Sequence, residues 1–190
     1  MPRHPDPELE ERILKAADAL WKRGGTKALT MRAVARAAGT NTPAVYRRFK
    51  NREDLVKGIL LRVADRIRRN FDQAKTLQDI AEMYLDFAVE NPNEYQLFFT
   101  EARLLNHPKK RGVAPRPIRE SRPNFAYVEQ QVAKELGGKP EDYTQLTLKL
   151  WCIAHGAALL LLANGIPEGH EGELRKACLA GVKTLIDNER

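Results

Sequence analysis

Apolar residues recur every three or four positions along most of this 190-residue chain. The first such set consists of Leu9, Ile13, Ala16, Ala17, Leu20 and Trp21. This spacing places side chains on one face of an α-helix, whereas a half-buried strand needs strict alternation. The pattern therefore predicts an all-α fold, and the chain is long enough to bury a sizeable core.

Polar caps and a glycine mark two short helices near the N-terminus. Thr30 is a good N-cap for a short helix that Gly39 ends. Asn41 or Thr42 caps a second short helix that runs to Phe49. Other helices are predicted from Asp6 or Pro7 to Gly24-Gly25, after the cap Asn51, over 76–90, in a short aromatic segment after Asn91-Pro92, and over 124–136, 141–163 and 171–187.

Positive charge is concentrated in the first third of the chain. Residues 1–72 contain 17 Lys and Arg against 9 Asp and Glu, while residues 73–190 contain 15 against 16. A basic part joined to a near-neutral part indicates that one of them meets a polyanion. Charge alone does not separate DNA from RNA or an anionic membrane.

The sequence does not show the patterns of several other protein classes. Cys152 and Cys178 form neither a disulfide framework nor a zinc pattern, so we expect a reducing, cytoplasmic setting. We expect no secretory signal, and the apolar run 150–163, which contains His155, is too short for a membrane span and predicts a buried helix. Phosphate-loop and metal motifs are missing and Ser121 is the only serine, so we expect neither an enzyme nor a cofactor or metal.

Residues 106–123 combine four prolines with six basic residues. This composition predicts a mobile loop or the frayed start of a helix. Its partner is left open between DNA, an acidic protein and water.

The segment from Thr30 to Phe49 is a helix-turn-helix candidate. Its first helix is pinned by Val34 and Ala35, and its second turns Val45 and Phe49 inward. An α-helix fits the major groove of B-DNA, and residues near its N-terminus reach base edges. On spacing alone, the alternative is a basic helical hairpin that binds nothing.

Two stretches carry a specific motif. Residues 30–39 read Thr-Met-Arg-Ala-Val-Ala-Arg-Ala-Ala-Gly, and residues 43–55 read Pro-Ala-Val-Tyr-Arg-Arg-Phe-Lys-Asn-Arg-Glu-Asp-Leu. Together they closely resemble the N-terminal domain of TetR-family transcriptional regulators, over roughly residues 8–60. Trp151, His155 and Gly156 also resemble the Trp-x-x-x-His-Gly signature of one C-terminal subgroup, the WHG type.

The resemblance implies an all-α protein of about nine helices. Residues 1–52 would form a three-helix DNA-binding domain with the helix-turn-helix, and a helix at about 52–72 would connect it to the rest. Residues 73–190 would form a ligand-binding and dimerisation domain. The last two helices would build a four-helix bundle with those of a second copy.

The resemblance also implies which residues meet DNA. Those expected to face bases are Thr42, Pro43, Ala44 and Arg47, with Arg47 reading a guanine and Ala44 a thymine methyl. Those expected at phosphates are Thr30, Arg32, Tyr46 and Lys50, and Thr40 and Asn41 complete the site; Thr40 stands where the family usually has an apolar residue. Alternatives remain: Arg47 contacts a phosphate or only water, Tyr46 packs internally, and Arg3 and His4 form either a minor-groove arm or a disordered terminus.

A small-molecule effector and a second copy of the chain are the other expected partners. Candidate pocket residues are Tyr84, Phe87, Tyr95, Phe98, Phe99, Phe125, Trp151 and His155, although most of them fit an ordinary core equally well. His155 either bonds a ligand, senses pH or donates a structural hydrogen bond. Candidate dimer residues are Ala158, Leu161, Leu162, Leu174, Cys178, Val182 and Leu185.

These observations predict a bacterial, cytoplasmic, nucleoid-associated regulator of transcription. We expect a repressor that a small molecule releases from a palindromic operator, and no membrane partner. The alternative is a non-specific architectural DNA-binding protein, because the same charges would serve it.

Overall fold

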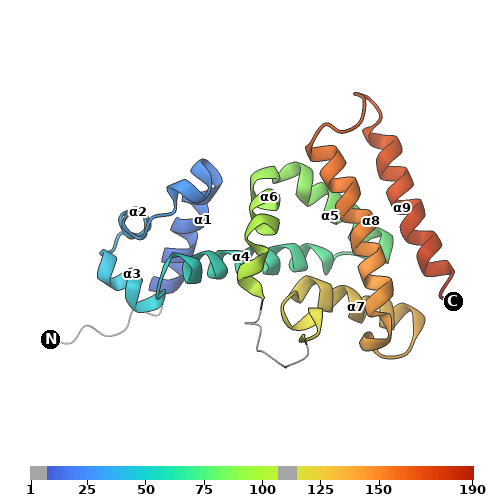
Figure 1. Ribbon diagram of the computed structural model, residues 1–190, viewed down its shortest axis with the longest axis horizontal. Helices are drawn as coiled ribbons and strands as arrows, with labels where there is room; N and C mark the ends of the chain where they lie inside the picture. The colour runs from blue at the N-terminus through green and yellow to red at the C-terminus, as the bar shows by residue number, and fades with distance from the viewer. Residues whose placement is uncertain (1–7, 107–114) are drawn as a thin grey trace. The chain divides into compact units, whose positions relative to one another are not determined.

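The structure, a computed structural model, describes residues 8–106 and 115–190 (Figure 1). Over these residues the regular secondary structure is helical and contains no strand, which confirms the all-α prediction. The α-helices are α1 (Leu9–Ala28), α2 (Met31–Ala37), α3 (Thr42–Arg48), α4 (Arg52–Phe71), α5 (Leu77–Glu90), α6 (Pro92–Glu101), α7 (Pro123–Leu136), α8 (Thr144–Leu162) and α9 (Glu171–Asp187). Short 3₁₀ turns lie at Ala102–Leu105, Ile118–Glu120 and Pro140–Tyr143.

The predicted end of the first helix is where the structure differs from the sequence pattern. Gly24 and Gly25 leave helical geometry, and Gly25 takes a φ of +60°, a left-handed value that glycine adopts without a steric penalty. The chain kinks at this pair and forms a further helical turn to Ala28. The proposed start at Asp6 or Pro7 lies outside the described residues.

The described residues form two compact units. The first contains residues 8–63 and 96–105, and the second contains Ala64–Tyr95 and 115–190 together with Asn106. Helices α4 and α6 therefore contribute residues to both units.

The first unit is built on the face of α1 that the sequence pattern predicts. Ile13 and Trp21 of α1 are buried with Val34 of α2 and Val45 of α3. Gly58 of α4 allows a close approach, since a Cβ atom there would lie 2.8 Å from Cδ2 of Leu14 and 3.2 Å from Cε1 of Phe49. The core thus fixes α1, α3 and α4 around one point.

The second unit packs α5, α8 and α9 against one another, with α7 beside α8 (Figure 1). Its core includes a charged side chain, Glu129 of α7, which is 1% exposed. Thr144 donates a hydrogen bond to Oε1 of Glu129 (2.7 Å), and Nε of Arg119 lies 3.2 Å from Oε2. Burial of a carboxylate is tolerated because these partners compensate it.

Arg119 belongs to the basic segment 106–123, of which residues 107–114 lie outside the described residues. Arg116 pairs with Glu120 (3.3 Å), and Arg122 donates to the side-chain oxygen of Asn106 (3.0 Å). Of the described basic side chains, Arg119 therefore ties this segment to Glu129 of α7 and Thr144 of α8, whereas Arg116 and Arg122 bond residues of the segment itself.

One helix is long and apolar enough to cross a membrane by length and composition. It is the 23-residue stretch Pro140–Leu162, which contains α8 and an 18-residue window with a mean hydropathy of 1.5. The core helix of a folded domain passes the same test, and one side of α8 packs on α5 and α9. Only 33% of its 18-residue apolar window is buried, however, so the prediction of a buried helix holds for one side of α8 alone.

Candidate nucleic-acid interface and effector site

The turn between α2 and α3 is fixed by its own backbone. Gly39 takes a φ of +63°, the left-handed conformation expected of the residue that ends α2. Its N–H donates to the carbonyl of Arg36 (3.2 Å), and the N–H of Thr40 donates to the carbonyl of Ala35 (2.9 Å). These two bonds form a Schellman motif, which sets the direction in which the chain enters α3.

Both short helices begin at the predicted kind of cap. Oγ1 of Thr30 accepts a hydrogen bond from the N–H of Ala33 (3.1 Å) at the start of α2. Oδ1 of Asn41 accepts one from the N–H of Ala44 (2.9 Å) at the start of α3, so Asn41 rather than Thr42 is the cap. Each cap satisfies a donor that the helix leaves unpaired.

The outer face of α3 carries Pro43, Tyr46 and Arg47, which follow a helical spacing and are all exposed. Tyr46 is 51% exposed, so it is not an internal packing residue. The other predicted DNA-contacting residues divide into exposed side chains, which are Thr30, Arg32, Asn41 and Lys50, and half-buried ones, which are Thr40 and Thr42.

Ala44 departs from the prediction that it faces bases. It is only 3% exposed and points inward beside Val45 (0%) and near the end of the helix at Phe49 (6%). A helix of seven residues has two turns, and its inner side is taken up by anchoring α3 to the core. The methyl group of Ala44 is therefore unavailable to a thymine methyl.

The electrostatic character of this region is uniformly basic. No acidic residue occurs between Asp18 and Glu53, whereas nine Lys and Arg residues do. Arg32, Arg47 and Lys50 are exposed on or beside α2 and α3. Such a surface attracts the phosphates of nucleic acid, and it exposes side chains that can reach a groove.

The start of α4, directly after this region, is fixed by a side chain from its first turn. Nη2 of Arg52 donates to the carbonyl oxygen of Thr26 (2.7 Å), and its Nε donates to the carbonyl oxygen of Leu29 (3.1 Å). Both acceptors lie at the end of α1.

In the second unit, four of the predicted pocket residues form one polar cluster. The hydroxyl of Tyr84 lies 3.0 Å from the hydroxyl of Tyr95 and 3.0 Å from Nδ1 of His155, and Tyr95 also bonds this nitrogen. Nε1 of Trp151 donates to the hydroxyl of Tyr84 (3.4 Å). We call Tyr84, Tyr95, Trp151 and His155 the tyrosine–histidine cluster; its members come from α5, α6 and α8.

Burial sets the protonation states in the tyrosine–histidine cluster. It raises the pKa of Tyr84 and raises the pKa of Tyr95 to about 12, so both keep their protons. Burial lowers the pKa of His155. A neutral imidazole whose Nδ1 accepts a hydroxyl proton carries its own proton on Nε2.

Of the remaining predicted pocket residues, Phe125 packs against this cluster. Phe125 packs edge-on against Trp151, with 6.1 Å between ring centroids, and Phe87 is buried on α5. Phe98 and Phe99 belong to the first unit, where their rings pack edge-on at 5.3 Å.

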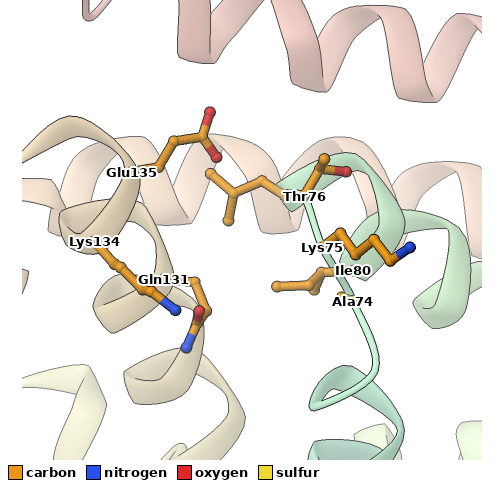
Figure 2. Close-up of a pocket in the computed structure, with 8 residues that line it drawn as sticks. Ala74, Lys75, Thr76, Ile80, Gln131, Lys134 and Glu135 are labelled. Carbon is orange, nitrogen blue, oxygen red and sulfur yellow. The ribbon is translucent and has the colours of Figure 1, made fainter.

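A separate cleft of about 300 Å³ lies between the start of α5 and the end of α7 (Figure 2). It is lined by Ala74, Lys75, Thr76, Leu77, Ile80, Gln131, Lys134 and Glu135, and none of the predicted pocket residues is among them. Figure 2 shows the amine of Lys134 beside Gln131, on the side opposite Ile80. Glu135 is paired with Arg190 (2.6 Å).

The residues that are exposed on α8 and α9 are not those predicted to form the dimer surface. Ala158, Cys178 and Val182 are at most 4% exposed and pack within the chain. Leu161, Leu162, Leu174 and Leu185 are half-buried. The exposed residues are instead Cys152, Gly156, Leu159, Leu160 and Ala163 on α8 and Ala177, Ala180 and Thr184 on α9.

Within residues 8–106 and 115–190, no group of three His, Cys, Asp or Glu side chains is placed to hold a metal ion.

Two family comparisons cover the two parts of the chain. Residues 13–59 match the sequence model of the bacterial regulatory proteins of the tetR family, and residues 77–184 match that of the tetracyclin repressor-like C-terminal domain. The second match alone spans more than half of the chain. The chain belongs to the TetR family.

Solved structures of TetR-family proteins share the fold. A protein from Rhodococcus sp. assigned to the TetR-family transcriptional regulators has 18% identity and a TM-score of 0.65, over 94% of this chain and 98% of its own. The multidrug binding protein EbrR complexed with ethidium has 17% identity and a TM-score of 0.64, over 95% and 99%. A TetR variant from Acinetobacter baumannii in complex with minocycline has 20% identity and a TM-score of 0.55, over 93% of each chain. Among curated proteins no relative matches the chain.

Membership of the TetR family makes this chain a transcriptional regulator with a DNA-binding helix-turn-helix, and the family is regulatory rather than enzymatic. Two features of the structure are not predicted from the sequence. Arg52 lies inside the recognised motif, but its acceptors are 26 and 23 residues away, a distance that no local pattern covers. The α5–α7 cleft joins segments about 55 residues apart and likewise has no local signature.

Proposed function

We propose that this TetR-family regulator is a dimeric repressor that leaves a palindromic operator when a small organic molecule binds its second unit. In this proposal, residues 1–52 bind DNA, α4 connects, and residues 73–190 bind the effector and the second copy. In this proposal the C-terminal part belongs to the WHG subgroup, which the residues Trp151, His155 and Gly156 support.

The observation that carries the DNA-binding part is the exposed basic face of a capped, glycine-ended helix-turn-helix. Pro43, Tyr46 and Arg47 point outward from α3, while Val45 and Phe49 anchor the helix. In this proposal Arg47 reads a guanine, and Thr30, Arg32 and Lys50 meet phosphates; the exposure of all four side chains supports these roles. Ala44 has no part in base contact, because it is buried.

The tyrosine–histidine cluster supports the effector site. Its aromatic rings offer stacking surfaces, and its hydroxyl and imidazole groups add polar atoms among them. Small-molecule sites commonly combine apolar walls with a few polar groups. Two similar structures contain ethidium and minocycline, both organic ring compounds, which supports an effector of this general class.

The exposed apolar face of α8 supports a homodimer. Leu159 and Leu160 are 47% and 42% exposed, and both lie beside small exposed residues of the same helix. Exposed apolar patches of this kind mark interaction sites. We assign this face to a second copy rather than to lipid, since the same helix holds His155 in a hydrogen-bonded cluster, and we place the dimer in the cytoplasm, on the nucleoid.

The alternative function is non-specific architectural DNA binding. It needs only the basic charge, whereas specific reading also needs outward side chains on a rigid helix, as α3 provides. The ratio of affinities for selected and random DNA separates the two.

The experiment is a selection of bound sequences from random duplex DNA at about 150 mM salt, where counterion-driven binding is weakened. A palindrome is the expected result, and adding the effector should then release it. Enrichment of no sequence, with binding that vanishes as salt rises, would contradict the proposal and favour the architectural function.

A further inference from the structure

Arg52 joins the start of α4 to the end of α1. Its Nη2–H group donates to the carbonyl of Thr26 (2.7 Å) and its Nε–H group to the carbonyl of Leu29 (3.1 Å). The carbonyl of Thr26 already accepts from the N–H of Leu29 (3.3 Å), which closes the last turn of α1. Hydrogen bonds from a charged guanidinium are stronger than neutral ones, and its planar fork holds both acceptors in one geometry.

The end of α1 is where such support has most effect. The last carbonyls of a helix have no partner within the helix, and this end of the helix dipole attracts a cation. The kink at Gly24 and Gly25 also separates the final turn from the regular helix before it. Arg52 therefore adds two hydrogen bonds from a distant part of the chain, and a second positive charge beside Lys27 of the last turn.

The two points that Arg52 joins enclose the helix-turn-helix. Leu29 directly precedes Thr30, the cap of α2, and Arg52 begins α4 soon after α3 ends at Arg48. The Arg52 end is itself rigid, because Oδ1 of Asn51 accepts from the N–H of Asp54 (2.8 Å). We call Thr26, Leu29 and Arg52 the Arg52 bracket.

We propose that Arg52 is a positioning residue for DNA recognition. The bracket fixes the position of the start of α2 relative to the end of α3, so that Thr30 and Arg47 contact DNA at the same time. Arg52 acts through backbone carbonyls and not through a phosphate. This inference rests on the proposed DNA-binding function.

The test compares Arg52→Met with the matched control Arg23→Met, on the DNA selected by the intact protein. Arg23 also donates to a carbonyl (Ala19, 3.2 Å), but within α1 and outside the bracket. We expect Arg52→Met to weaken operator binding about tenfold, the effect of losing a charge-assisted hydrogen bond, with the salt dependence unchanged. Arg23→Met should bind as the wild type does, and Arg52→Lys, which replaces the fork by a point charge, should recover part of the loss.

Two outcomes of this titration would overturn the inference. If Arg52→Met lowers the slope of affinity against salt by about one unit, Arg52 is a phosphate contact. If the affinity is unchanged, the bracket does not position the interface.

Hydrogen exchange separates a failure of the inference from a failure of the proposed function, because it needs no DNA. In Arg52→Met, the amides of Leu29, Thr30 and Ala33 should exchange faster, while core amides of α4 near Ile59 keep their protection. Arg23→Met should leave all of them unchanged. If the three amides do not respond, the bracket is overturned even where DNA binding is established; if they respond while the intact protein selects no DNA, only the proposed function fails.

Discussion

Arg47 and Lys50 are both exposed and basic, yet their positions predict different roles. Arg47 lies on the outer face of α3, and Lys50 lies just beyond its end. Arg47→Ala should cost about 1–3 kcal/mol of discrimination at one base pair. Lys50→Ala should weaken all DNA sequences alike and lower the salt slope by about one unit. Titrations of operator variants at several salt concentrations test this, and identical behaviour of the two variants would contradict the division of roles.

Because His155 is partly buried, we expect the stability of the protein to depend on pH. Burial lowers its pKa below the usual 6.5, so on acidification the unfolded chain takes up the proton first. The contribution of His155 to the free energy of unfolding is therefore complete above pH 6.5 and is lost as the pH falls below that value.

Urea unfolding between about pH 7.5 and pH 5.5 measures this effect. The wild type should lose more stability over this range than His155→Gln. The matched control is His170→Gln, since His170 is 55% exposed and pairs with Glu173. If all three proteins lose the same stability on acidification, the buried imidazole is not the cause.

At the scale of single residues, the sequence predicts helix caps well but does not predict which distant residues become partners. The caps Thr30, Asn41 and Asn51 are predicted correctly, because a cap depends on residues three positions away. Ala44 is misplaced, since nothing in a seven-residue helix shows which small side chain completes the core. The partners of Arg52 and His155 become neighbours only in the folded chain.

At the scale of the element, α8 presents two apolar sides. One packs on α5 and α9, and the other exposes Leu159. Leu159→Glu should place a charge in the proposed dimer interface, where its desolvation is costly, and give monomers in sedimentation. Leu61→Glu on α4 is the matched control, because Leu61 is also 47% exposed, and it should remain dimeric. Persistent dimers of Leu159→Glu would place the interface elsewhere.

Helix positions are largely predictable here because periodicity and caps are local. The helix predicted over 171–187 is found at Glu171–Asp187, and the one over 76–90 at Leu77–Glu90. Which side of a helix meets its own chain is not predictable in the same way. Ala158, Cys178 and Val182 follow an apolar spacing that serves the core and a dimer surface equally, and the structure assigns them to the core.

At the scale of the whole molecule, the proposed two-fold dimer requires a two-fold operator. Recognition helices that enter successive major grooves fix the half-site centres about 34–36 Å apart. Inserting about 5 base pairs, half a turn, between the half-sites should turn them to opposite sides of the duplex and reduce affinity to that of one half-site. Gel-shift titration of the two operators checks this, and equal affinities would show that the halves bind independently.

The Arg52 bracket also bears on how such a regulator changes its target. Because the Arg52 side chain holds its acceptors through backbone carbonyls, which every residue type possesses, the contact places little demand on the side chains between Leu29 and Arg52. Substitutions on the outer face of α3 leave these bonds intact. The residues on the outer face of α3 can thus change with the DNA sequence that is read, while Val45 and Phe49 keep the helix anchored in the core.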